Sequence, residues 1–67
     1  MNAHDEARIQ LKNARNMAEA ALRALDLPNY EAAANMLERA EKCIWKASIA
    51  IGEAAWEKEA KRERPTA

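Results

Sequence analysis

The sequence predicts an all-α protein, an antiparallel two-helix hairpin in which the second helix is the longer. Three observations predict it. Ala, Glu, Lys, Arg, Leu and Met, which have the highest helix propensities, dominate the 67 residues, and Ala alone supplies 17 of them. Val and Phe, which favour strands, are absent. The single strong internal break is Leu27-Pro28-Asn29, and helices joined by so short a turn are antiparallel neighbours.

The first helix is expected over about residues 4–26. Asn2 or His4 can cap its start, and acidic residues follow in the first turn, where they interact favourably with the helix dipole. Proline disfavours helical backbone in the residue before it, so this helix ends near residue 26 and residues 27–29 form the turn. The whole chain is therefore expected to be one helical-hairpin domain.

The second helix is expected over about residues 30–63. Asn29 is suited to cap its start, and Pro65 ends it and leaves a short C-terminal tail. At a rise of about 1.5 Å per residue the two helices are about 34 Å and about 51 Å long. Because of this difference, the second helix is expected to have no intramolecular partner beyond about Gly52.

Apolar residues recur along both helices at alternating spacings of four and three, the pattern of an antiparallel coiled-coil seam. Alternate members are Ala, which lets two helices approach closely. The expected seam contains Ala7, Leu11, Ala14, Ala18, Ala21 and Leu25 in the first helix and Ala33, Leu37, Ala40, Ile44, Ala47, Ile51 and Ala54 in the second. The short turn is expected to place Leu11 near Ile44 or Trp45 and Ala7 near Ile49.

Each helix carries a second apolar stripe beside this seam. The stripes are Ile9, Met17, Ala20 and Ala24 in the first helix and Met36, Cys43, Ala50 and Ala54 in the second. A helix that is apolar over more than half of its circumference must be covered on more than one side, and a hairpin covers only one. We therefore expect a homodimeric four-helix bundle or a higher homo-oligomer. The alternative is a monomer with an exposed face of Ala and Met.

Trp45, Ile49 and Trp56 lie on one line of the second helix, on its otherwise polar side. Gly52, the only glycine, and Glu53 lie beside them. A glycine inside a helix costs about 1 kcal/mol relative to Ala, which indicates a reason such as the close approach of another chain. Because Trp is enriched at binding hot spots, these five residues are the predicted protein-binding site. In the alternative interpretation, the Trp side chains close the bundle or the dimer interface.

The composition argues against an enzyme. The chain has one His, one Cys, one Ser, one Thr and one Tyr, and nucleophilic catalysis needs a nucleophile, a base and an orienting group in contact. We predict no metal and no cofactor, and we expect Cys43 to be a small core residue. No run of about 18 apolar residues and no secretory signal is present, so the expected location is the cytoplasm, with no membrane partner.

A nucleic-acid interface is the alternative function. Arg8, Lys12, Arg15 and Arg23 share one face of the first helix, which Glu19 interrupts. A charged helix face is usually only solvated, no aromatic residue interleaves with this one for base stacking, and the formal net charge is +0. In architecture and length the predicted dimer resembles the plasmid-copy-number RNA-binding helical hairpin.

Two further resemblances concern other families. The stretch Asn29-Tyr30-Glu31-Ala32-Ala33, followed by Leu37 and Ala40, resembles the second helix of a tetratricopeptide repeat. In size and predicted architecture the whole chain is similar to small helical-hairpin proteins with which bacteriophages bind and inhibit bacterial host proteins, such as an anti-activator of quorum sensing. This second resemblance implies a homodimeric regulator that inhibits a host or regulatory protein through its second helix. A small assembly chaperone is a further alternative.

Overall fold

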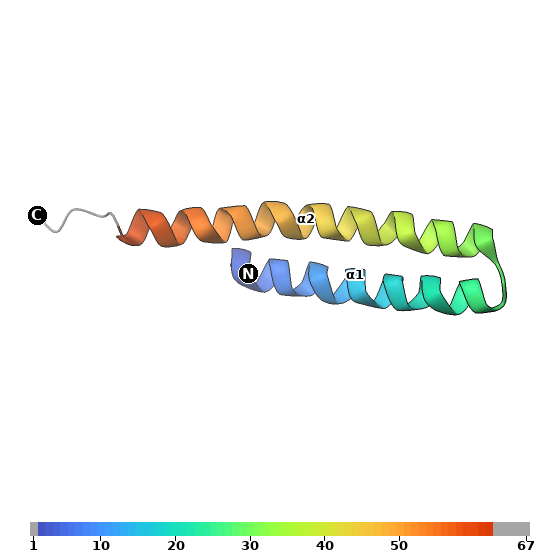
Figure 1. The fold of residues 1–67 in the computed structure, drawn as a ribbon. Helices are drawn as coiled ribbons and strands as arrows, with labels where there is room; N and C mark the ends of the chain where they lie inside the picture. The colour runs from blue at the N-terminus through green and yellow to red at the C-terminus, as the bar shows by residue number, and fades with distance from the viewer. Residues whose placement is uncertain (1, 63–67) are drawn as a thin grey trace, which may run out of the picture.

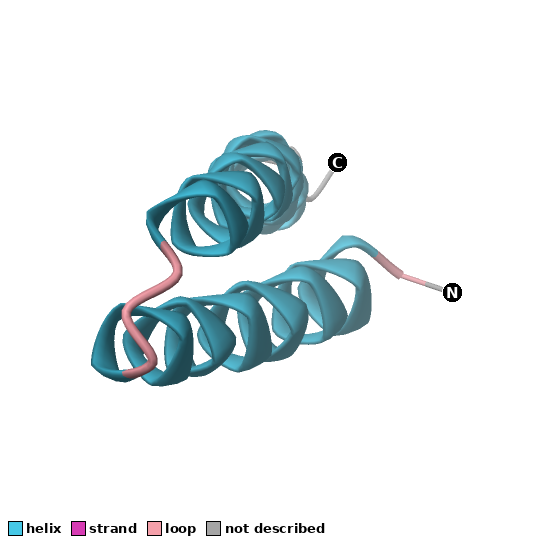
Figure 2. Ribbon diagram, turned by 90° about the vertical axis from the view of Figure 1, so that its right-hand side faces the viewer, coloured by secondary structure: helices cyan, strands magenta, loops and turns pink. Residues whose placement is uncertain are grey.

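The computed structural model describes residues 2–62, and along them the chain forms two α-helices and no strand. Helix α1 spans Ala3–Asp26 and helix α2 spans Tyr30–Arg62. The helices run antiparallel, side by side, and one short turn joins them (Figure 1). The view toward the turn shows no further layer on either side (Figure 2). The predicted helical hairpin is confirmed, whereas the four-helix bundle stays a prediction. The expected helix end near residue 63 and the stop at Pro65 lie outside the described residues.

Both helices begin with an asparagine cap. The Oδ1 atom of Asn2 accepts a hydrogen bond from the backbone N–H three residues later at 2.8 Å, and Oδ1 of Asn29 accepts the equivalent bond at 3.0 Å. At the end of α1, the N–H groups of Leu27 and Asn29 both donate to the carbonyl oxygen of Ala24, at 3.3 and 2.6 Å. Pro28 lies between these two donors and has no backbone N–H, so no donor of the turn needs a further partner. Local sequence therefore sets both helix starts and the turn.

The buried core of the hairpin consists of alanine alone. The buried residues are Ala7, Ala14 and Ala24 in α1 and Ala33, Ala40, Ala47 and Ala50 in α2. Burial is deepest at Ala40 and Ala47, which are 2% and 1% exposed. Methyl groups at the contact allow the helices to approach toward the short end of the usual separation of about 8–10 Å. The larger seam residues Met17, Met36 and Cys43 are only partly buried.

The seam observed inside the hairpin differs from the expected seam at every second position. The expected seam continues from an alanine to the residue four positions later, whereas the observed seam continues to the residue three positions later. These residues are Gln10, Met17 and Ala24 in α1 and Met36, Cys43 and Ala50 in α2. Most of the second apolar stripe of the sequence therefore forms the intramolecular seam.

The expected seam residues four positions after these alanines lie on a flank of the observed seam and not inside it. Ala18 is exposed, and Leu11, Leu25, Leu37, Ile44 and Ile51 are 47–53% exposed. The physical reason is the short distance between the helices, because branched side chains of this size do not fit between two closely packed backbones. The one polar seam residue, Gln10, has a partner, since its Nε2 donates to Oε1 of Glu6 at 3.0 Å.

The short turn sets the register of the two helices. Because α1 ends at Asp26 and α2 begins at Tyr30, residues equally far from the turn are about level, which places Ala7 about level with Ile49. Ala7 also lines a groove with Ile51 and Ala54, and Ala54 is half-buried. Helix α2 continues past the start of α1 (Figure 1).

Candidate functional site: two apolar surfaces and a basic groove

Side chains able to carry chemistry are dispersed over the hairpin. His4 lies in the first turn of α1, Cys43 is half-buried in the seam, and Ser48 is exposed in the middle of α2. Within residues 2–60, no polar or charged residue is buried, and no group of three or more His, Cys, Asp or Glu side chains is placed to hold a metal ion. Over the same range, neither helix is both long and apolar enough to cross a membrane. The surfaces of the hairpin therefore carry the functional argument.

One side of the hairpin is apolar, and we name it the apolar face. It consists of Leu11, Ala18, Leu22 and Leu25 of α1 and Leu37, Ile44 and Ile51 of α2. A groove of about 460 Å³ joins the two helices on this side. Its lining is Ala18, Ala21, Leu22, Leu25, Ala33, Ala34 and Leu37, so large side chains border a floor of alanine. Residues seven positions apart lie on nearly the same side of a helix, so the apolar face continues along both helices.

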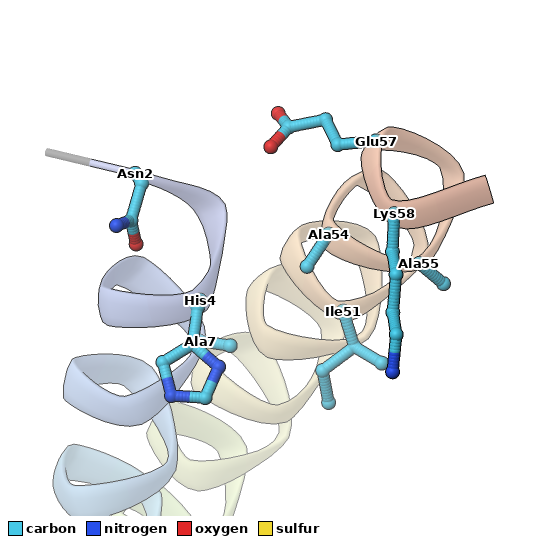
Figure 3. Close-up of a pocket in the computed structure, with 8 residues that line it drawn as sticks. All are labelled: Asn2, His4, Ala7, Ile51, Ala54, Ala55, Glu57 and Lys58. Carbon is cyan, nitrogen blue, oxygen red and sulfur yellow. The ribbon is translucent and has the colours of Figure 1, made fainter. Parts of the chain in front are cut away.

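A second groove, of about 530 Å³, continues the apolar face at the open end of the hairpin. In Figure 3 the side chains of His4, Ile51 and Lys58 extend to the same side, while Ala7 and Ala54 lie between the helices. Polar residues border the face along both helices. They are Arg8 and Arg15 on the α1 edge and Glu41 and Ser48 on the α2 edge, all exposed. An apolar centre with a polar rim is the usual anatomy of a protein interface.

The second apolar surface is the tryptophan strip, which consists of Trp45, Ile49, Gly52 and Trp56 on the outer side of α2. Trp45 and Trp56 are 67% and 72% exposed. At 3.6 residues per turn the strip lies opposite the seam and roughly 110° around α2 from the apolar face, and the two Trp Cα atoms are about 16 Å apart. Trp45 therefore does not face α1. Glu53, which the sequence grouped with this site, is exposed beside the strip.

Gly52 interrupts the tryptophan strip with bare backbone. A Cβ atom at Gly52 would meet nothing within 4 Å, and no residue of the described chain has a positive φ. Neither packing inside the hairpin nor backbone conformation therefore requires glycine here. The approach of another chain, which the sequence suggested as the reason, stays a prediction.

The predicted nucleic-acid face is exposed but mixed in sign. Its basic members are Arg8, Lys12, Arg15 and Arg23, each exposed along α1. At 3.6 residues per turn, Asp5, Glu19 and Asp26 occupy the same arc of the helix. Three carboxylates among four cations leave little positive field for a phosphate backbone.

Sequence reasoning missed a more uniform basic surface on the side of the hairpin away from the apolar face. A groove of about 360 Å³ there is lined by Asn13, Met17, Arg39, Lys42, Cys43 and Lys46. The signal that could have found it is the spacing of Arg39, Lys42 and Lys46 at i, i+3 and i+7, which puts three cations on one helix face. We name these three residues the basic groove.

No protein-family model matches the chain, and neither a curated protein nor a solved structure is significantly similar to it. The assignment of function therefore depends on the physical character of the two apolar surfaces and of the basic groove.

Proposed function

We propose that this chain is a non-catalytic protein-interaction module that binds a regulatory protein through the tryptophan strip. One observation carries the proposal. Trp45 and Trp56 stand on the side of α2 opposite the seam, each about two thirds or more exposed, where their indoles add little to the packing of the hairpin. Large aromatic side chains that contribute little to a fold are suited to anchor a partner, because burial of one indole on binding removes a large apolar area from water.

The shape of the strip favours an elongated partner surface. Ile49 lies between the two indoles, and the bare backbone at Gly52 leaves room for a partner side chain or backbone to enter between them. Exposed Lys42 and Glu53 border the strip with opposite charges and supply a polar rim. By covering a functional surface of its target, the module inhibits or redirects that protein, which agrees with the resemblance to phage-encoded regulators.

Trp56→Ala is the direct test of this function. We expect it to weaken target binding at least about thirtyfold, the effect of losing a hot spot worth about 2 kcal/mol, with little change in helix content. Tyr30→Ala is the matched control, because Tyr30 is 71% exposed and lies at the other end of α2. The wild-type chain is used to capture its target from the native host, and the dissociation constant of that target is then measured with all three proteins. Equal constants for wild type and Trp56→Ala would contradict the proposal.

Binding of an anionic chain such as RNA is a second candidate function, which the basic groove favours. If Lys42 and Lys46 contact phosphates, the double substitution Lys42→Gln/Lys46→Gln lowers the slope of log affinity against log salt by about 1.5. The substitution Arg8→Gln/Arg15→Gln on the mixed face of α1 is the control and is expected to leave the slope nearly unchanged. A wild-type affinity for single-stranded RNA that does not vary with salt excludes this function.

A further inference from the structure

The apolar face has no partner inside the hairpin, and we infer that a second copy of this chain covers it. The protein is then a dimer of hairpins in which both tryptophan strips remain on the outside. This inference does not depend on the target of the tryptophan strip, because it concerns a different side of α2 and different residues.

The accessible surface of the chain is too large for a compact monomer. It measures 5589 Å², whereas a compact folded monomer of 7.5 kDa exposes about 4,250 Å². The excess is roughly 1,300 Å². A standard protein interface buries about 800 Å² on each partner, which is less than this excess.

The side chains of the apolar face form layers across the two helices. Leu25 and Leu37 border one groove. Because α1 ends at Asp26 and α2 begins at Tyr30, residues equally far from the turn are about level, which sets Ala18 beside Leu37 and Leu11 beside Ile44. Packing of a second copy turns these half-exposed layers into the core of a four-helix bundle, which the alanine seam alone cannot supply.

The face is suited to pack against itself. An interface between two identical copies must be self-complementary, with ridges and hollows on the same patch. Here Leu25 and Leu37 form ridges, and the alanine floor between them forms the hollow. The polar edges also offer one complementary pair, because Arg15 on the mixed α1 edge is about level with Glu41 on the α2 edge. A two-fold axis that lies in the interface, parallel to the helices, brings Arg15 of one copy beside Glu41 of the other.

Packing on the apolar face leaves both tryptophan strips free. Each strip lies roughly 110° around α2 from that face, so the two strips point away from the interface. The dimer therefore presents two equivalent protein-binding sites, and a target with two copies of its epitope is held by both.

A matched pair of substitutions on α2 tests the inference. Ile44 and Ile49 are 53% and 45% exposed in the hairpin, but only Ile44 belongs to the apolar face. We expect the wild type to sediment at twice the chain mass of 7.5 kDa. Because Ile44→Glu places a carboxylate in the centre of an apolar interface, it is expected to raise the dimer dissociation constant at least about a hundredfold. Ile49→Glu is expected to change it by less than about twofold.

Two measurements on the wild type keep the test decisive if Ile44→Glu does not fold. The thermal midpoint of a dimer rises with protein concentration, and both indoles should remain accessible to acrylamide in the assembled particle. A monomer at millimolar concentration, dissociation by Ile49→Glu but not by Ile44→Glu, or indoles shielded on assembly would each overturn the inference. All of these measurements use the purified chain without its target. A negative result for the dimer is therefore distinguishable from a negative result for target binding by Trp56→Ala.

Discussion

Ala47→Leu is expected to destabilise the hairpin by about 2 kcal/mol or more, the upper part of the range for overpacking a well-filled core. Ala47 is 1% exposed and is the most deeply buried residue of the alanine seam. A leucine there adds three carbon atoms between two backbones, and the helices must separate along their whole length to admit them. Separation weakens the contacts of every other alanine of the seam, so the loss spreads beyond the substituted site.

The measurement is urea-induced unfolding followed by far-ultraviolet circular dichroism. Ala60→Leu is the control, because Ala60 is exposed near the end of α2 and Leu has almost the helix propensity of Ala. We expect this control to unfold at the wild-type urea concentration within error. Equal stability of Ala47→Leu and wild type would mean that the helices are not closely packed at Ala47, and the alanine seam would then be wrong.

Gly52→Ala is expected to stabilise the protein. Because a methyl group at Gly52 meets nothing within 4 Å and the backbone is helical, the gain is the helix propensity of Ala over Gly, about 1 kcal/mol. For a domain of this size, that corresponds to a rise in the thermal midpoint of about 4–8 °C. Calorimetry at fixed protein concentration checks the result, and an unchanged or lower midpoint would contradict it.

The same substitution is expected to weaken binding of the target of the tryptophan strip about tenfold, equivalent to about 1.4 kcal/mol. The added methyl group fills the space between the indoles that a partner needs. Ser48→Ala, an exposed substitution elsewhere on α2, is the control and should leave binding unchanged. If Gly52→Ala stabilises the chain but binds its target as well as wild type does, Gly52 lies outside the contact.

The local features of this fold follow from short stretches of sequence. Asn2 and Asn29 each satisfy an N–H three residues further on, and Pro28 interrupts helical hydrogen bonding between two helix formers. These effects act within a few residues, so they do not depend on how the helices pack. The exposed line of Trp45 and Trp56 was predictable for the same reason, since helical periodicity alone puts them on the polar side of α2.

The choice of seam was not predictable in this way. After every seam alanine except Ala7, apolar residues stand at both the third and the fourth position, as Cys43 and Ile44 do after Ala40, so periodicity fits either line. The basic groove escaped notice for a related reason, because its lining comes from both helices and depends on which flank of the seam they expose.

The chain composition and its one break are thus sufficient to define two helices, their caps and their antiparallel course. Which apolar line lies between the helices and which large side chains face outward are decided by packing. The reason is distance: two backbones that meet through alanine leave no room for Leu or Ile at the contact, so those side chains move to the flank and form a surface that no local pattern identifies.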